Sequence, residues 1–370
     1  MLIKDFNKQF KEEIAARGIA RIETQKIPFS SPRANYMLYG GIPRGRIIEF
    51  AGEENGGKTT TALDVVANAQ PLFKEEWEDE IKELQEIAKP KKEEQTRLDY
   101  LKARGPKQIV YADCENTLDE DWARNLGVDV DNMVILKPMS QTAEQIFEML
   151  LQTIETDEVG LVVIDSLGVM LSAQAYEKSM EEKTYGGIAA ALTLFSKKAE
   201  LLCSKYNCTL IGINQMREDM NSPYGGTITT GGKGWKHNCS VRLMFQKGSY
   251  IDERGNEIKR SSESPAGNLV MINVAKTKVC KPDRRVGFYT LRYDSGIDIV
   301  ADTIEVALKY GIIQQAGAWF NFVDIDTGEI ISDDEGETIK IQGKPNLIEY
   351  LEDNQYLLEE ITEKINSLIY

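Results

Sequence analysis

Residues 45–70 read GRIIEFAGEENGGKTTTALDVVANAQ. Apolar and β-branched residues lead into the pattern GxxxxGK[ST] at 52–59 and helix-forming residues follow, which is the order of strand, loop and helix around a phosphate-binding loop. Backbone N–H groups of such a loop point at phosphate oxygens, Lys58 reaches the β and γ phosphates, and the Thr59 hydroxyl can hold Mg²⁺. The alternative is a glycine-rich turn that binds no nucleotide, which this context disfavours. The predicted ATP-binding residues are Gly52, Glu53, Glu54, Asn55, Gly56, Gly57, Lys58, Thr59 and Thr60.

Four further apolar runs have the length of strands: QIVYADCE at 108–115, GLVVIDSL at 160–167, CTLIGINQ at 208–215 and NLVMINVAKTK at 268–278. Helical patterns separate the first four of the five strands at intervals too long for hairpins. Crossover connections of this kind join parallel strands and place helices on both faces of the sheet. The sequence therefore predicts an α/β fold with a mostly parallel central sheet.

Three of the predicted strands end in a polar side chain that suits nucleotide chemistry: Glu115, Asp165 and Gln215. Ligands of open α/β sheets lie at the carboxyl ends of the strands. Asp165 is placed to bind water ligands of Mg²⁺, and Glu115 to polarise the water that attacks the γ-phosphate. The Gln215 amide is placed to sense the γ-phosphate. A helix cap is the alternative for either carboxylate, and a plain loop residue for the glutamine.

The composition is that of a globular chain with room for more than one module, because 42% of its 370 residues are hydrophobic and 28% are charged. No stretch approaches the ~20 apolar residues of a membrane helix, and the first residues lack the apolar run of a signal peptide. Five scattered cysteines and the single histidine, His237, disfavour structural zinc. We expect a cytoplasmic protein without a membrane partner.

Charge is distributed unevenly along the chain. The formal net charge of -15 argues against a polyanionic partner at long range. However, residues 321–370 hold 13 acidic and 3 basic side chains, whereas residues 214–285 hold 13 basic and 7 acidic ones. A basic channel beside an acidic tail is typical of a nucleic-acid binder. A solvated surface explains the acidic tail equally well.

Three segments lie outside the predicted sheet. Phe6, Phe10 and Ile14 have helical spacing and predict an N-terminal helix that docks on its own domain or on a neighbouring subunit. Residues 73–106 are charged, rich in helix formers and broken by Pro90, which predicts an exposed helical hairpin, either a solvated spacer or an arm for protein contacts. Short strands and a final helix at about 346–368 predict a small α+β module. The predicted division is 1–27 for the N-terminal helix and oligomerisation segment, 28–298 for the ATPase core and 299–370 for an acidic C-terminal domain.

From about residue 28 to residue 320 the sequence resembles the RecA-type homologous-recombination proteins. The resemblance implies a DNA-dependent ATPase that forms a filament on single-stranded DNA and exchanges strands with a homologous duplex. Its motifs are GGIPRGRIIEFAGEENGGKTT at 40–60, DCENTLDEDWARNLGVDVDNM at 113–133, VVIDSL at 162–167, INQMR at 213–217, TTGGKGWKHNCSVRL at 229–243, VAKTKV at 274–279 and AGAWF at 316–320.

The resemblance also implies roles for single residues. It makes Glu115 the catalytic carboxylate, Asp165 the partner of the Mg²⁺ waters and Gln215 the switch between ATP and DNA loop two. Three residues would contact the adenine, and two lysines would reach across a subunit interface to the neighbour's γ-phosphate. These are Asp119, Trp122 and Tyr293 for the base, and Lys276 and Lys278 for the phosphate. Ordinary helix packing is the alternative for the tryptophan, and a lysine-defended strand edge for the lysine pair.

DNA loop one is expected at 171–187 and DNA loop two at 217–235. Glycines of loop two permit close backbone approach, and its N–H and hydroxyl groups can bind phosphates without reading bases. The predicted DNA-binding residues are Arg217, Gly225, Gly226, Thr229, Thr230, Gly231, Gly232, Lys233 and Lys198.

The chain departs from the family pattern at several places. Loop one carries Glu177, Glu181 and Glu182, and Ala191 replaces the usual arginine on the helix beyond it. His237 stands where the family has a relay phenylalanine, as a polar variant of that relay or as a packed residue, and packing is slightly favoured. Together with the insertion at 73–106, these departures favour a divergent branch such as the phage recombinases.

The resemblance implies single- and double-stranded DNA, a helical homo-oligomer and single-strand-binding or mediator proteins as partners, with ATP and Mg²⁺ as cofactors. The alternative is a RecA-fold ATPase that acts as a helicase-like motor or as a regulatory, clock-type ATPase. Those proteins should not combine TTGGKGWKHNCSVRL after INQMR with VAKTK beyond it.

Overall fold

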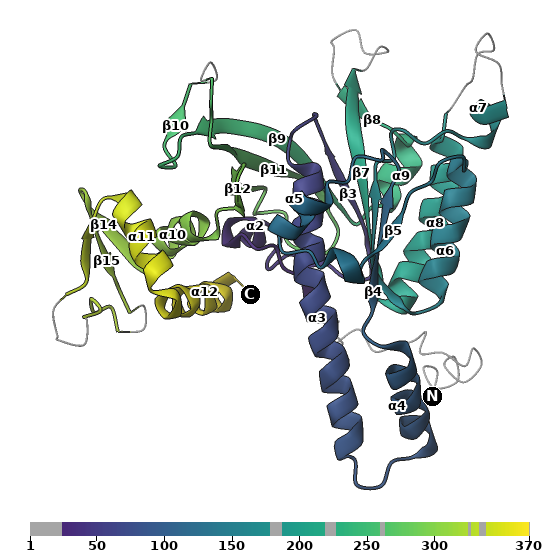
Figure 1. The fold of residues 1–370 in the computed structure, drawn as a ribbon, viewed down its shortest axis with the longest axis horizontal. Coiled ribbons are helices and arrows are strands. Elements are labelled where there is room, and N and C mark those ends of the chain that lie inside the picture. Colours follow the sequence, from purple (N-terminus) through teal and green to yellow (C-terminus); the bar gives the residue numbers. More distant parts are fainter. Residues whose placement is uncertain are drawn as a thin grey trace.

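The computed structural model describes residues 24–177, 187–218, 227–259, 263–324, 327–332 and 338–369 (Figure 1). The helix predicted near residues 4–16 lies outside this part of the chain. An α/β core carries a helical hairpin at one end, and a small C-terminal unit lies beside it.

The central sheet is mostly parallel, as predicted. Its strands run in the order β13-β12-β11-β9-β3-β7-β6-β4-β5, and the six from β9 to β5 are parallel. The parallel strands are β3 (Ile47–Gly52), β4 (Gln108–Asp113), β5 (Val134–Leu136), β6 (Val159–Asp165), β7 (Thr209–Glu218) and β9 (Val241–Ile251). The antiparallel extension consists of β11 (Gly267–Thr277), β12 (Val286–Arg292) and β13 (Gly296–Ile297), while β8 (Thr227–Thr229) pairs with β7 and β10 (Glu257–Ile258) with β9.

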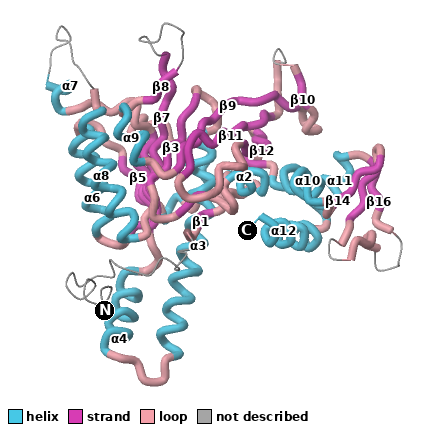
Figure 2. Tube along the Cα trace, turned by 180° about the vertical axis from the view of Figure 1, so that it is seen from behind, coloured by secondary structure: helices cyan, strands magenta, loops and turns pink. Residues whose placement is uncertain are grey.

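Helices cover both faces of this sheet because their apolar residues recur at helical spacing. One face is covered by α6 (Ala143–Glu155) and α8 (Ala189–Tyr206), which lie side by side (Figure 2). These helices bury Ile146, Leu150 and Phe195, among others. On the other face α3 (Lys58–Glu86) and α5 (Glu120–Asn125) pack on a second apolar cluster. Short elements complete the core: β1 (Lys26–Ile27), α2 (Pro32–Met37), β2 (Ile42–Pro43), the 3-10 turn Val130–Asn132, α7 (Ala173–Glu177) and α9 (Gly232–Asn238).

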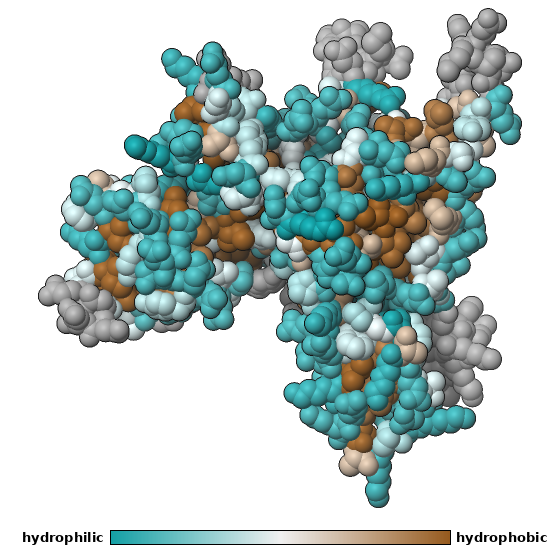
Figure 3. Space-filling model, viewed as in Figure 1, coloured by the Kyte–Doolittle hydropathy of each residue, from teal (hydrophilic) through white to brown (hydrophobic). Residues whose placement is uncertain are grey.

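A helical hairpin occupies the stretch for which the sequence predicts one. Its first arm is not a separate element, because α3 runs for 29 residues from the phosphate loop to Glu86. The second arm is α4 (Lys92–Arg104). Trp77 Nε1 donates to Leu101 O at 2.8 Å, and Arg97 pairs with Glu80 at 2.7 Å. In Figure 3 a narrow band of apolar surface lies along the hairpin between hydrophilic side chains.

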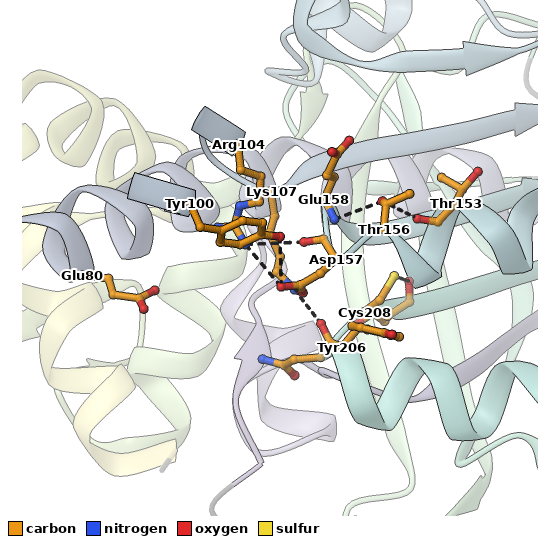
Figure 4. A network of polar contacts seen from close by, with 12 residues as sticks. Glu80, Tyr100, Arg104, Lys107, Thr153, Thr156, Asp157, Glu158, Tyr206 and Cys208 are labelled. Atoms are coloured by element: carbon orange, nitrogen blue, oxygen red, sulfur yellow. Dashed lines mark hydrogen bonds and ion pairs between the residues drawn. The ribbon is translucent and has the colours of Figure 1, made fainter. Parts of the chain in front are cut away.

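The base of the hairpin is fixed to the core by Asp157, which lies between α6 and β6 (Figure 4). Lys107 Nζ donates to Asp157 Oδ1 at 2.8 Å and to Tyr206 O at 2.5 Å. Tyr100 and Arg104 approach the same carboxylate at 3.3 and 3.8 Å. Asp157 and Lys107 therefore connect four parts of the chain: α4, the α6–β6 turn, the start of β4 and the end of α8.

The C-terminal unit combines helices with a small antiparallel sheet. Its elements are α10 (Ile299–Tyr310), β14 (Ile313–Ala316), β15 (Trp319–Phe322), β16 (Lys340–Gln342), α11 (Lys344–Asp353) and α12 (Gln355–Ile369). The prediction of one final helix at about 346–368 was wrong, because the chain forms two helices that are separated at Asn354. Asn354 caps the end of α11, because its side chain donates to Tyr350 O at 2.7 Å and its backbone N donates to the same oxygen at 3.1 Å. None of the helices in the described part of the chain has the length and apolar content of a membrane span.

Candidate nucleotide and DNA site

The phosphate loop joins the carboxyl end of β3 to the first turn of α3. Gly57 has a φ of 91°, which favours glycine, and caps the helix. A Cβ on Gly52 would lie 2.4 Å from Phe245 O, so only glycine fits where β3 passes β9. The loop and the N-terminus of a 29-residue helix therefore meet at the carboxyl edge of the sheet, where backbone N–H groups and the helix dipole suit an anion.

Lys58 lies inside the loop and is 7% exposed. Its Nζ donates to Gly52 O at 3.1 Å and to Glu53 O at 2.6 Å. Burial lowers the pKa of Lys58, against the opposing effect of the carboxylates of Asp165 and Glu115. The ammonium is thus held where an incoming phosphate can replace carbonyl oxygens as its partner.

Asp165 closes β6 directly beside the start of α3. Thr59 Oγ1 donates to Asp165 Oδ2 at 2.8 Å, and Tyr111 OH donates to the same oxygen at 2.7 Å. Burial raises the pKa of Asp165, while the two hydroxyls oppose this shift. A hydroxyl and a carboxylate at one point are hard oxygen ligands, so these residues fit Mg²⁺ held by Thr59 with Asp165 behind its waters.

Glu115 lies in the loop after β4 and meets β6 and β7. Ser166 Oγ donates to Glu115 Oε1, and Gln215 Nε2 donates to the same oxygen at 3.0 Å. Asp113, which pairs with Asp165 in the sheet, accepts from two backbone N–H groups of this loop at 3.1 Å each. The three residues predicted from strand ends are therefore brought together with the phosphate loop.

Two of the three residues expected to contact adenine line one depression of about 510 Å³ beside the loop. Trp122 and Tyr293 face it together with Asn55, Gly57 and Thr60 of the loop region. Lys247, which sequence reasoning missed, also lines it and lies 5.7 Å from the Tyr293 ring centroid.

The third, Asp119, caps helix α5. Its Oδ1 accepts from Trp122 N at 3.0 Å, as expected of an acidic N-cap. Trp122 packs against the core and also lines the depression, and its contact with adenine stays a prediction.

In the hydrogen bonds of the described residues, the side chains of Lys276 and Lys278 do not bond to the phosphate loop. Lys276 Nζ donates to Lys236 O at 2.8 Å and to His237 O at 2.7 Å, at the end of α9. The register shifts between Val274 and Lys276, before both lysines, and β11 ends at Thr277, so Lys278 lies just beyond the strand. Lys278 N still donates to Ser240 O at 2.9 Å, and the shared face of the two lysines stays a prediction. The preference for His237 as a packed residue was wrong, since its side chain is exposed.

Residues 178–186 of DNA loop one and 219–226 of DNA loop two lie outside the described residues, including Gly225, Gly226, Glu181 and Glu182. The described ends, α7 and β8, project from the same end of the sheet (Figure 1). The predicted hydroxyls of loop two are turned inward, because Thr229 and Thr230 Oγ1 atoms are both buried. The other predicted DNA-binding residues of the described part have varied surroundings. Gly231 and Gly232 both have positive φ, and Lys233 is exposed. Arg217 Nη2 donates to Gly168 O at 2.9 Å, and Lys198 Nζ lies 3.7 Å from Glu148 Oε2.

Glu49 joins loop two to the sheet, and sequence reasoning missed it. This fully buried carboxylate accepts from Asn214 Nδ2 and from Trp235 Nε1 at 3.0 Å each, and it pairs with Arg242. Asn214 also donates to Thr230 O at 2.8 Å. A charged residue amid the apolar run IIEF was the available signal.

The sheet order, the loop at the end of β3 and the carboxylates at the ends of β4 and β6 define a P-loop nucleotide-binding protein. A model of the RecA N-terminal domain matches residues 3–75 and 100–298, and one of the RecA C-terminal domain matches residues 301–369. The chain belongs to the RecA family, as the resemblance predicted. The unmatched residues 76–99 form most of the hairpin.

Curated relatives agree with this assignment. The chain is 30% identical to protein RecA of Thermus aquaticus over 367 residues, which cover 98% of this chain and 92% of that protein. Identity to protein RecA of Ruminococcus albus is 30% over 364 residues, or 97% and 77% of the two chains. Identity to protein RecA of Streptomyces ambofaciens is 31% over 341 residues, or 92% and 76%. These identities are consistent with a divergent member of the family.

Proposed function

We propose that the protein is a DNA-dependent ATPase that forms a helical filament on single-stranded DNA and catalyses homologous pairing and strand exchange, in the cytoplasm. The observation that carries this proposal is the junction at Glu115. One carboxylate oxygen accepts both from Ser166, next to the Mg²⁺ residue Asp165, and from Gln215, on the strand that leads into loop two. A change at the γ-phosphate would therefore reach the start of a DNA loop through a single hydrogen bond.

The proposed division of labour follows from these positions. Lys58 and the loop N–H groups bind the phosphates, and Thr59 holds the metal with Asp165 behind it. Bound Mg²⁺ would neutralise charge that develops on the phosphates. Glu115 orients and polarises the attacking water, and Gln215 exchanges its bond to Glu115 for one to the γ-phosphate. Trp122 and Tyr293 supply π-faces for the adenine.

Lys276 and Lys278 are proposed to act on the neighbouring subunit's γ-phosphate. In the single chain Lys276 is bound to carbonyls at the end of α9, a helix that begins within loop two. Its release toward a neighbour would free that helix end, so nucleotide at the interface and DNA at loop two would be coupled. This proposal needs the filament, in which residues 1–27 are assigned to oligomerisation, 28–298 to the ATPase core and 299–370 to a small acidic domain.

Strand exchange itself is the sharpest test of the proposal. Circular single-stranded DNA incubated with homologous linear duplex, ATP, Mg²⁺ and the protein should yield joint molecules that a heterologous duplex does not yield. A helicase-like motor would separate strands without needing homology, and a clock-type ATPase would do neither. Either of those results would contradict the proposal.

A further inference from the structure

We propose that Tyr111 is a positioning residue for the Mg²⁺–nucleotide site, a role that rests on the proposed ATPase function. Tyr111 lies in β4 opposite Val163 of β6 and is 1% exposed. Its hydroxyl is 2.7 Å from Asp165 Oδ2. A buried phenol placed on a metal-site carboxylate has a purpose beyond filling the core, because phenylalanine would fill the same volume without a polar atom.

Two donors from different elements converge on one oxygen of Asp165. Thr59 reaches Oδ2 from the first turn of α3 at 2.8 Å, and Tyr111 reaches it from the middle of the sheet. A carboxylate rotates about its Cβ–Cγ bond unless its oxygens are held. Hydrogen bonds of this kind orient metal ligands and their partners, and their loss typically lowers metal affinity by about 10- to 100-fold.

The two donors differ in what happens when metal binds. Thr59 would turn a lone pair toward Mg²⁺ while its O–H can still donate to Asp165, so this donor would itself be a metal ligand. Tyr111 is fixed by the strand pairing of β4 with β6 and touches no atom of the phosphate loop in the hydrogen bonds of the described residues. The Tyr111 hydrogen bond therefore orients the Asp165 carboxylate independently of the phosphate loop and of the metal.

This division predicts a selective effect. The Lys58 ammonium, which is proposed to bind the phosphates, donates to Gly52 O and Glu53 O and has no hydrogen bond to the Tyr111 hydroxyl among the described residues. Removal of the hydroxyl should therefore weaken the metal-dependent part of nucleotide binding and leave the metal-free part intact. A merely structural tyrosine would affect both parts alike.

The test compares the wild-type full chain with Tyr111→Phe by fluorescence titration of mant-ATP, once in EDTA and once across a range of Mg²⁺. We expect the Mg²⁺ concentration at half-maximal binding to rise roughly 10-fold in Tyr111→Phe, with metal-free affinity within about twofold of wild type. An unchanged Mg²⁺ midpoint would overturn the proposal. An equal loss of metal-free affinity would also overturn it, since Tyr111 would then be structural.

Tyr289→Phe is the matched control. Tyr289 is likewise 1% exposed and its hydroxyl lies beneath the phosphate loop, 2.9 Å from Thr61 Oγ1 and 3.3 Å from Gly57 O, without contact to Asp165. Its Mg²⁺ midpoint should match wild type, and a shift as large as that of Tyr111→Phe would contradict a specific role. A wild-type protein that binds no mant-ATP would overturn this inference and the proposed function together. Binding of Mg²⁺–nucleotide without strand exchange would overturn only the proposed function.

Discussion

Buried carboxylates can be compared at two places, the strand ends of the candidate nucleotide site and the junction at which Ser30 and Ser31 meet Asp64 of α3 and Asp302 of α10. Asp165 is 6% exposed at the first place, and Asp64 and Asp302 are 2% and 0% exposed at the second. Asp302 accepts from Ser31 Oγ at 2.6 Å and from Thr290 Oγ1 at 3.0 Å. Asp64 accepts from the neighbouring Ser30 N at 3.1 Å.

Burial raises the pKa of all three carboxyls, to about 6 for Asp64 and Asp302. A raised pKa therefore does not separate a reactive site from a structural joint. The hydrogen-bond partners do separate them, because the junction carboxylates bind donors of the segments that they hold in place, whereas one donor to Asp165, Thr59, belongs to the phosphate loop. Substitutions at the two places should consequently fail in different ways.

Lys58→Ala should have the largest effect. Loss of the only ammonium inside the loop leaves phosphate charge without its main partner, so nucleotide binding or turnover should be abolished while the fold remains. Nucleotide titration together with circular dichroism measures both. Near wild-type hydrolysis with a normal spectrum would show that the loop is not the nucleotide site.

Glu115→Gln should separate binding from turnover. The amide keeps the shape of the side chain but cannot act as a base, so hydrolysis should fall by roughly 10² or more with ATP and DNA affinities retained. Steady-state rates and equilibrium binding on the same preparation decide this. A matching loss of ATP affinity would make Glu115 a structural carboxylate like those of the junction.

Alanine at both Lys276 and Lys278 should reduce DNA-stimulated hydrolysis far more than nucleotide binding by the single chain. If the lysines act on a neighbour, mixtures of Lys276→Ala/Lys278→Ala subunits with Glu115→Gln subunits should recover part of the activity, because some interfaces then combine an intact lysine pair with an intact Glu115. Rates measured across mixing ratios test this. A complete lack of recovery, with each variant still binding DNA, would argue against a shared site.

Asp302→Asn should change stability with pH and leave the nucleotide site intact. A carboxyl whose pKa is raised on folding is destabilising when ionised, so the wild type loses stability as pH rises from about 4 through about 6. The free energy of unfolding of the variant, relative to that of the wild type, should therefore rise by roughly 1–3 kcal/mol between pH 5 and pH 7.5. Urea unfolding at the two pH values measures the difference. A pH-independent difference would show that Asp302 does not titrate in this window.

The sequence predicted the parts of the fold that leave a local pattern. Lys58, Asp165 and Gln215 follow apolar strands, and parallel strands bring their ends to one edge of the sheet, so their meeting could be foreseen. The long arm of α3 could be read only as charge and helix propensity, which do not reveal that one helix continues through Pro71 to Glu86.

What escaped prediction depends on contacts between distant segments. Tyr111 and Glu49 lie in strands as ordinary residues, and only the pairing of those strands with their neighbours shows what their polar atoms meet. The irregular register before Lys276 and the break at Asn354 are likewise set by packing around them. A local stretch of sequence shows the hydrophobic periodicity of a helix or strand, but it says little about which distant segments that element will contact.

The central claim is that one site links ATP hydrolysis to DNA, and ATPase rate with and without single-stranded DNA tests it most directly. The wild type should hydrolyse ATP slowly alone and several times faster when single-stranded DNA is added, and Lys58→Ala should be inactive in both conditions. A wild-type rate that DNA leaves unchanged, in protein that binds both ligands, would contradict the coupling through Glu115 and Gln215.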